Sequence, residues 1–250
     1  MKYAAYTATR NLYEKMVPSI KSLLLNSDVD KVYLLIEDDK FPVELPKECE
    51  CINVSKQKIF RVMSPNNCYP WAYMSMMRAA LYKMLPDVDV VLSLDADTII
   101  DGDISMLWKY PIDDYYFVAA AEPDRCQDGK IYTNIGVMMM NLAKLRDGKG
   151  DEIINALNWK RYEILEQDAL NELCQEHIGL VPSIYNTCAF TAPCDNPAIV
   201  HYAGIRDWTD VPLVQKYMGI PFSEIRKPVR RRRKSEDRGV LRTEGSALND

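Results

Sequence analysis

The sequence lacks the features that mark membrane-spanning and disulfide-bonded secreted proteins. No apolar run among its 250 residues is long enough to cross a bilayer. The opening MKYAAYTATR has no apolar core of the kind found in secretory signals, and it is expected to form a first strand. The seven cysteines are an odd set without a C-x-x-C pair, so neither a zinc site nor a disulfide framework follows. Buried free thiols in a reducing cytosol are the expectation.

Charge is unevenly distributed along the chain. Residues 226–250 carry nine Lys and Arg against four Asp and Glu, whereas the whole chain has a formal charge of −5, so residues 1–225 are acidic. An acidic body does not favour nucleic-acid binding, and no nucleic-acid partner is expected. The segment RKPVRRRRK at 226–234 indicates a solvated, disordered tail. The alternative is that this basic segment contacts anionic lipid, which would make the protein peripheral to the inner face of the membrane.

Strand-like and helix-like segments alternate, which predicts a doubly wound α/β architecture in one domain over residues 1–225. Pro18 is expected to kink the first helix or to mark its true start. The expected strands are 2–7, 31–36, 51–54, 88–94, 116–121, 136–141 and 198–202, and the expected helical segments are 11–26, 73–84, 104–107, 152–157 and 167–175.

The strongest functional signal is Asp95-Ala96-Asp97, which follows the apolar run VDVVLSL at 88–94. Strand residues two apart point the same way, so both carboxylates should project together where the strand meets its loop. Ligands of open α/β sheets bind at that edge, and two hard oxygen donors there suit Mg²⁺ or Mn²⁺. The alternative reading is a pair of acidic turn or helix-cap residues.

His201 is the second candidate, because it follows the apolar strand AIV and opens the loop HYAG at 201–204. Function tends to collect at such junctions between strand and loop. A lone histidine in this position is more often structural, so its interpretation depends on what accompanies it.

Together with these two signals, further segments resemble, in order, the retaining glycosyltransferases of family 8, which contains glycogenin and bacterial lipopolysaccharide galactosyltransferases and glucosyltransferases. The family implies a single Rossmann-like nucleotide-sugar-binding domain of the GT-A type, with a mostly parallel central sheet flanked by helices. The matching segments are TATRNLY at 7–13, Arg78, VVLSLDADTIIDGDISMLW at 90–108, NIGVMMMN at 134–141, EQDALN at 166–171 and HYAG at 201–204.

The resemblance implies a UDP-hexose donor and Mn²⁺, with Mg²⁺ as the alternative cation. Asp95, Asp97 and His201 would be its ligands, Tyr13 would stack on uracil, and Gly136 would allow close approach of the backbone. Asn134 and Gln167 would contact the transferred sugar. The residues that the resemblance places around the donor are Thr7, Ala8, Thr9, Tyr13, Arg78, Asp95, Ala96, Asp97, Gly136, Gly204 and Arg206.

The chain departs from the family pattern at three places. Glu166 stands where the family usually has Asp, which moves the carboxylate one methylene outward. The lysine that clasps the diphosphate is missing after Gly204, and Arg206 is a candidate replacement one residue early. Arg10 replaces a small polar residue near the nucleotide. These changes bear on donor affinity and donor identity rather than on the fold.

The sequence leaves the chemistry and the acceptor open. Retention could proceed through a covalent intermediate on Asp168, or by same-face attack beside the neutral amide of Gln167. A glycan, a lipid-linked sugar or a protein side chain could accept the hexose. Two other functions compete with the transferase: a haloacid-dehalogenase-like phosphatase that uses Asp95-Ala96-Asp97-Thr98, and a non-catalytic homologue that binds nucleotide sugars.

Overall fold

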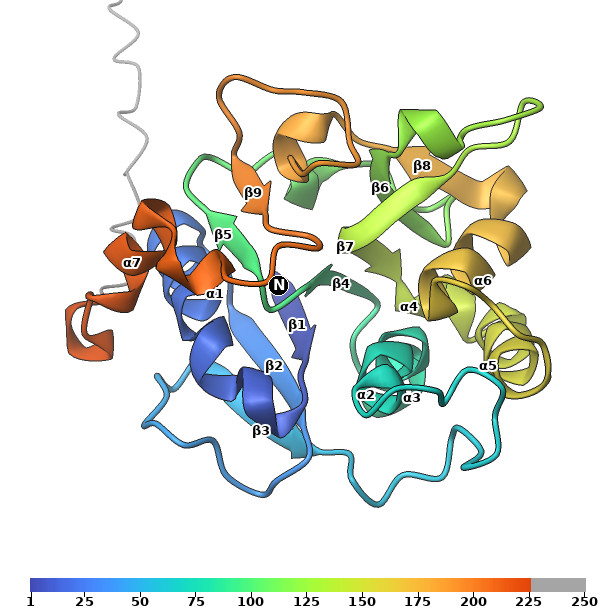
Figure 1. The fold of residues 1–250 in the computed structure, drawn as a ribbon, viewed down its shortest axis with the longest axis horizontal. Helices are drawn as coiled ribbons and strands as arrows, with labels where there is room; N and C mark the ends of the chain where they lie inside the picture. Colours follow the sequence, from blue (N-terminus) through green and yellow to red (C-terminus); the bar gives the residue numbers. More distant parts are fainter. Residues whose placement is uncertain (226–250) are drawn as a thin grey trace, which may run out of the picture.

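The computed structural model describes residues 1–225, and the tail predicted over 226–250 lies outside the described residues. Its centre is a seven-stranded sheet with the order β3-β2-β1-β4-β7-β6-β8, and a smaller sheet pairs β5 with β9 (Figure 1). The strands are β1 Tyr3–Thr7, β2 Lys31–Ile36, β3 Cys49–Asn53, β4 Val90–Leu94, β5 Thr98–Ile100, β6 Phe117–Ala121, β7 Thr133–Asn141, β8 Ile178–Leu180 and β9 Ile199–His201.

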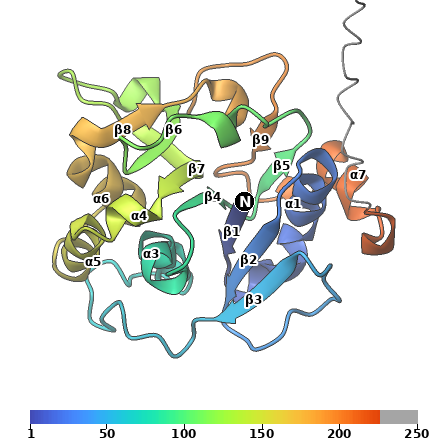
Figure 2. The same cartoon turned by 180° about the vertical axis from the view of Figure 1, so that it is seen from behind.

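The large sheet is mostly parallel, as predicted. Strand β1 lies parallel to β2 and β4, β2 to β3, and β6 to β8, whereas β7 runs antiparallel to both β4 and β6. Helices α1 and α7 lie side by side, and α2 to α6 form a separate group beyond β4, as Figures 1 and 2 show. The helices are α1 Tyr13–Asn26, α2 Ala72–Met76, α3 Leu81–Met84, α4 Leu142–Leu145, α5 Lys149–Trp159, α6 Leu165–Leu173 and α7 Pro212–Met218.

Two hydrophobic cores cover the two faces of the sheet, because successive strand residues point to opposite sides. In β7, Met138 and Met140 pack with the α2–α6 group, while Val137 and Met139 pack with α1. Burying an aliphatic side chain of this size contributes about 1.5–3 kcal/mol relative to exposure. Both faces of the central strands are therefore apolar, which explains their near-continuous hydrophobic sequences.

Several predicted boundaries need correction. The helix predicted over 73–84 is interrupted by a 3-10 turn at Met77–Ala80, so α2 and α3 are separate. Pro18 lies inside α1 rather than at its start. The helical turn predicted at 104–107 is a 3-10 turn at Leu107–Lys109. Tertiary packing sets these limits, which local propensity alone does not define.

The cysteine prediction is half right. All seven thiols are free, as expected, but Cys174 is the one that is fully buried. Cys68 and Cys126 are exposed, because they lie in loops rather than in strands or helices that pack against the core. Within residues 1–225, no helix is long and apolar enough to cross a membrane.

Candidate functional site

Two aspartates and a histidine meet at the edge of the large sheet. Asp95 and Asp97 follow strand β4, as predicted, but they lie in a tight turn between β4 and β5 rather than in extended backbone. The turn is closed by the Thr98 hydroxyl, which donates to the Asp95 carbonyl at 2.8 Å. Antiparallel pairing of β5 with β9 sets His201 opposite Thr98 and so brings the imidazole to the turn. The carboxylates converge because of this turn, not because of strand alternation.

The three side chains are close enough to share one ion. Their nearest ligand atoms all lie within 4.8 Å of one another, and His201 Nε2 lies 3.4 Å from Asp95 and 3.3 Å from Asp97. Burial disfavours the charged imidazole, but hydrogen bonds and charges of Asp97 and Cys188 raise the pKa of His201 to about 9. Burial likewise disfavours the Asp97 carboxylate, yet His201 brings the pKa of Asp97 below its ordinary value. Each charge is thus stabilised by the others.

His201 is held in one orientation by neighbours that the sequence did not reveal. Its Nδ1 lies 2.9 Å from the side-chain oxygen of Asn186, a fully buried residue. The Asn186 amide nitrogen donates to two acceptors on Asn134, its backbone carbonyl at 3.1 Å and its side-chain oxygen at 2.9 Å. These two hydrogen bonds orient the Asn186 amide so that its oxygen, an acceptor, faces the imidazole. Nδ1 must therefore carry a proton, and Nε2 faces the aspartates.

Gly136 supports the same ring from another side. A Cβ atom at Gly136 would overlap the His201 imidazole, lying 2.7 Å from each ring nitrogen. The predicted close approach of backbone at this glycine is therefore toward His201, a residue of the cluster itself. The Gly136 carbonyl also accepts a hydrogen bond from the Asp95 backbone nitrogen at 2.8 Å.

Arg78 connects the cluster to the helix group. Its guanidinium is buried, pairs with Asp95 and donates to the Ile135 carbonyl at 2.9 Å. Burial lowers the pKa of Arg78, while the charges of Glu166 and Asp97 act in the opposite direction. An arginine paired in this way orders a carboxylate, one of the two roles that the sequence suggested for it.

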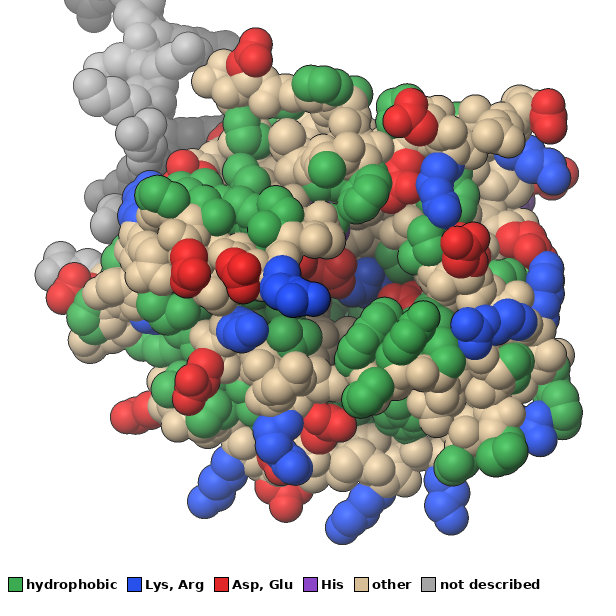
Figure 3. Space-filling view, viewed as in Figure 1, with side chains coloured by type: hydrophobic (Ala, Val, Ile, Leu, Met, Phe, Trp, Pro, Cys, Tyr) green, Lys and Arg blue, Asp and Glu red, His purple; other side chains and the backbone are tan. Residues whose placement is uncertain are grey.

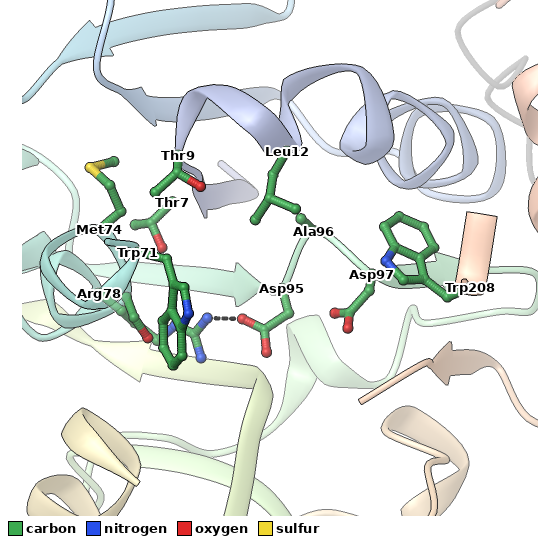
Figure 4. Close-up of a pocket in the computed structure, with 11 residues that line it drawn as sticks. Thr7, Thr9, Leu12, Trp71, Met74, Arg78, Asp95, Ala96, Asp97 and Trp208 are labelled. Carbon is green, nitrogen blue, oxygen red and sulfur yellow. Dashed lines mark hydrogen bonds and ion pairs between the residues drawn. The ribbon is translucent and has the colours of Figure 1, made fainter. Parts of the chain in front are cut away.

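A cavity of about 200 Å³ opens above the two aspartates (Figure 3). Arg78 and Trp71 lie on one side of the acidic pair and Trp208 on the other (Figure 4). Of the residues predicted around a donor, Thr7, Thr9, Arg78, Asp95, Ala96 and Asp97 line it. Sequence reasoning placed Leu12 in a matching segment without giving it a role, and it missed Trp71, Met74, Ser75 and Trp208. Their proximity to the recognised segments was the only signal that could have indicated them.

Two residues predicted to contact the nucleotide do not reach this cavity. Tyr13 is 3% exposed, with its ring against Phe41 and its hydroxyl bonded to Asp38 and the Glu37 backbone. Tyr13 therefore exposes almost no ring surface to the cavity in this structure, and its stacking on uracil stays a prediction. Its neighbour Leu12 lines the cavity instead. Ala8 is buried beneath the surface, and its backbone nitrogen bonds to Leu35.

Asn134 and Gln167 belong to one buried hydrogen-bond network whose hub is Glu122. Asn134 Nδ2 donates to Glu122 Oε1 at 2.8 Å, and Gln167 Nε2 donates to the same oxygen at 3.2 Å. The Gln167 oxygen accepts from the Ile135 backbone at 3.2 Å. Asn134 lines neither the cavity above the aspartates nor the adjoining one, because its amide is engaged inward. Gln167 lines the adjoining cavity, which has a volume of about 400 Å³.

Asp168 lines neither of the two cavities beside the acidic cluster. It lines a separate cavity of about 530 Å³, and both its oxygens accept hydrogen bonds, from the Tyr132 hydroxyl at 2.5 Å and from the Ile164 backbone at 2.7 Å. Glu166 points differently. One of its oxygens accepts from the Ser75 hydroxyl at 2.6 Å, while the other is buried and has no hydrogen-bond partner within residues 1–225. Glu166 is among the residues that line the 400 Å³ cavity, so a buried carboxylate with one unpaired oxygen lies at that cavity.

The predicted loop residues lie at the rim. Gly204 has φ +76, a conformation that glycine adopts without strain, so the chain turns sharply after His201. Arg206 is exposed and does not line the cavity above the aspartates. Arg10 is exposed too and pairs with Asp38, with its guanidinium nitrogens 2.6 and 2.8 Å from the two carboxylate oxygens. Arg78 is thus the cation that lines this cavity among residues 1–225.

The donor set fits a divalent cation. Once Nε2 gives up its proton, two carboxylates and one imidazole nitrogen supply hard oxygen and borderline nitrogen ligands, a combination that suits Mn²⁺ and Mg²⁺. The hydrogen bond to Asn186 leaves Nε2 directed at the same point as the two carboxylates. Ligating histidines commonly donate their other ring N–H to a fixed acceptor in this way.

The comparisons with known proteins agree on the family and the fold. Residues 4–211 match the model of glycosyl transferase family 8. A putative glycosyltransferase of Haemophilus influenzae is 27% identical, over 49% of this chain and 40% of its own length, so the chain spans less than half of that curated relative.

Among solved structures, galactosyltransferase LgtC in complex with donor and acceptor sugar analogues is 18% identical, with a TM-score of 0.65 and coverage of 88% of this chain and 97% of LgtC. The glycosyltransferase GlyE of Streptococcus pneumoniae TIGR4 is also 18% identical, with a TM-score of 0.65 over 90% of this chain and 63% of GlyE. Mouse xyloside xylosyltransferase 1 is 17% identical, with a TM-score of 0.59 over 81% of this chain and 97% of that enzyme. The fold is of the GT-A type.

Proposed function

The chain belongs to glycosyl transferase family 8, and from this premise we propose that it is a metal-dependent retaining hexosyltransferase. Its donor is UDP-glucose or UDP-galactose, and its acceptor is a glycan, a lipid-linked sugar or a protein side chain. The observation that carries the proposal is the convergence of Asp95, Asp97 and His201 beside a cavity. Family membership leaves the phosphatase alternative without support.

Asp95, Asp97 and His201 would hold Mn²⁺, with Mg²⁺ as the alternative. The bound ion would act as a Lewis acid on the diphosphate of the departing UDP. Arg78 keeps Asp95 oriented toward the ion. The family lysine is missing, so among the side chains that line this cavity Arg78 is the one that, together with the ion, would balance the negative charge of the diphosphate.

The transferred hexose would occupy the 400 Å³ cavity that adjoins the acidic pair. The unpartnered oxygen of Glu166 accepts a sugar hydroxyl there, since a buried carboxylate oxygen without a donor is otherwise costly. Gln167 presents its carbonyl oxygen, which the Ile135 backbone and Glu122 hold in place. Asn134 acts behind this surface by orienting Glu122 and Asn186.

These positions favour same-face attack over a covalent intermediate on Asp168. The Asp168 carboxylate lines a different cavity and is already bonded through both oxygens. Gln167 is a neutral amide and a poor nucleophile, but its oxygen can support positive charge that develops at the anomeric carbon. The acceptor hydroxyl then approaches from the side of the departing UDP.

Removing one carboxylate of the cluster tests the proposal. Asp97→Ala is expected to lower Mn²⁺-dependent hydrolysis of UDP-glucose or UDP-galactose by at least about 100-fold, because the ion loses a ligand. EDTA should abolish the wild-type activity and added Mn²⁺ should restore it. Asp103→Ala, an exposed aspartate in the loop after β5, serves as the matched control. Full wild-type activity in EDTA would contradict a metal-dependent transferase, and no hydrolysis under any condition would favour the non-catalytic homologue.

A further inference from the structure

Two aromatic rings lie stacked and exposed beside the site. Tyr69 and Trp71 precede α2, their ring centroids are 5.1 Å apart and their planes differ by 6°. Each is nearly half exposed, at 48% and 47%. A tyrosine and a tryptophan that pack mainly on one another retain a large apolar area in contact with water, which often marks a binding surface.

The aromatic pair forms one wall of the 400 Å³ cavity. The same cavity is also lined by polar side chains, among them Glu163, Glu166 and Gln167, next to Ile164 and Leu165. The cavity shares Trp71, along with Arg78 and Asp95, with the pocket above the acidic cluster, so the two adjoin. Hydrophobic side chains gather on the rim of the hollow in Figure 3.

The mixed lining of this cavity, aromatic and polar, selects the occupant. A pyranose ring has an apolar face of C–H groups and an edge of hydroxyls, which match stacked aromatic rings and a carboxylate with an amide. A nucleobase fits less well, because Tyr69 does not line the pocket that holds Thr7, Leu12 and Trp208. A lipid chain would leave the polar lining residues Glu163, Glu166 and Gln167 unpaired.

Resting on the proposed function, we propose that Tyr69 and Trp71 are the platform on which a sugar ring of the acceptor stacks. The acceptor is therefore a saccharide, free or lipid-linked, and not a protein side chain. The stacked ring lies over the mouth of the cavity, with its hydroxyl edge toward Glu163 and Gln167. Trp71 lines both cavities, so the stacked acceptor lies next to the nucleotide pocket, as same-face attack requires.

Saturation-transfer NMR with disaccharides tests the platform. Maltose, cellobiose and lactose are each mixed with the full-length protein, UDP and Mn²⁺. At least one should receive saturation mainly at the C–H protons of one ring face. Tyr69→Ala and Trp71→Ala should each weaken that disaccharide's binding by about two- to tenfold, which is the range expected from losing one aromatic stacking partner. Trp159→Ala is the matched control, since Trp159 is 66% exposed and stacks on Arg61 away from the site.

Tyr69→Ala should leave the affinity for UDP unchanged in isothermal titration calorimetry, because Tyr69 does not line the pocket above the aspartates. Saturation of none of the three disaccharides, or equal saturation in Tyr69→Ala and Trp159→Ala, would overturn the platform. So would a Tyr69→Ala variant that loses UDP affinity and keeps its disaccharide signal. Hydrolysis of the UDP-sugar donor needs no acceptor. If the protein hydrolyses UDP-sugar with Mn²⁺ but fails these tests, the platform is refuted and the proposed function stands.

Discussion

At the scale of single residues, the site depends on groups whose orientation is fixed by buried partners. His201 has its Nδ1 on Asn186, Asn186 has its amide nitrogen on Asn134, and Asn134 has its own amide on Glu122. The amide nitrogen of each asparagine faces a hydrogen-bond acceptor. Neither amide can flip without leaving a buried group unpaired. The same Glu122 oxygen receives Gln167, so the histidine and the glutamine share one network.

Substituting Asn186 tests whether this network positions the histidine. Asn186→Ala should reduce Mn²⁺ affinity by about 10- to 100-fold, since His201 loses the acceptor that fixes its tautomer and ring orientation. Mn²⁺ binding is measured by electron paramagnetic resonance, with chemical denaturation alongside. Asn158→Ala removes another buried asparagine, which bonds to Arg61 and Ile59 away from the site. The positioning role is refuted if both variants lose stability equally and both keep wild-type Mn²⁺ affinity.

Gln167→Ala addresses the reacting centre itself. If the Gln167 oxygen supports charge in the transition state, kcat should fall by about 10- to 1000-fold while the donor KM changes little. Steady-state kinetics with the hydrolysed UDP-sugar separate the two constants. Gln175→Ala is a suitable control, because Gln175 lies beyond the end of α6 and bonds to Ile131 and Asn171. A kcat within twofold of wild type would remove Gln167 from the active site.

At the scale of elements, strand β7 serves both the sheet and the cluster. All nine of its residues are buried, and it separates β4 from β6 in the sheet. Near its start Gly136 lies directly under the His201 ring, so the strand needs a residue without a side chain at that point. Residues 137–140, which follow Gly136, pack into both cores. This packing fixes the position of Gly136 relative to the acidic cluster.

Gly136→Ala should therefore displace the imidazole rather than break the strand. Mn²⁺ affinity is expected to fall by at least about tenfold, and stability by roughly 1–3 kcal/mol, the usual cost of overpacking a buried site. Titration calorimetry with Mn²⁺ and UDP gives the affinity, and urea unfolding gives the stability. Gly219→Ala, where an added Cβ meets nothing closer than 3.6 Å, should change neither. Unaltered metal affinity in Gly136→Ala would show that the ring does not need this contact.

The sequence predicted long, periodic elements better than short ones. KVYLLI at 31–36 forms β2 with the expected bounds, because a continuous β-branched and aliphatic run has few alternatives. The short β5 was not predicted, since Thr98–Ile100 becomes a strand only by pairing with β9. That pairing is what brings His201 to the aspartates. Asn186 and Glu122 were missed for the same reason: their roles arise from contacts between segments far apart in the chain.

At the scale of the whole molecule, the acidic cluster and both cavities lie where the two halves of the sheet meet. Strand β4 is parallel to β1 on one side and antiparallel to β7 on the other, so the direction of the sheet changes there. Thr7 and Thr9 approach from the first half, and Gly136 and Gln167 from the second. A ligand placed at this junction touches elements from most of the chain, as is usual for open α/β sheets.

The basic segment 226–234 gives a prediction at this scale that does not depend on its conformation. Its seven Lys and Arg residues should attract anionic lipid, with about 1 kcal/mol for each basic residue near the surface. Full-length protein is expected to cosediment with vesicles that contain roughly 30% phosphatidylserine, which approximates the physiological content of anionic lipid. Deletion of 226–250 should abolish that binding, and so should about 0.5 M salt, because screening shortens the reach of the charges.

Donor hydrolysis in solution should be the same for the full-length protein and for the 226–250 deletion, since the acidic cluster and its supporting network lie within residues 1–225. A matched variant with the seven basic residues of 226–234 changed to glutamine separates charge from chain length. If the deletion releases the protein from vesicles but the glutamine variant stays bound, the attraction is not electrostatic. Vesicle binding that persists after the deletion would place the contact on the acidic body, where the net charge of residues 1–225 opposes it.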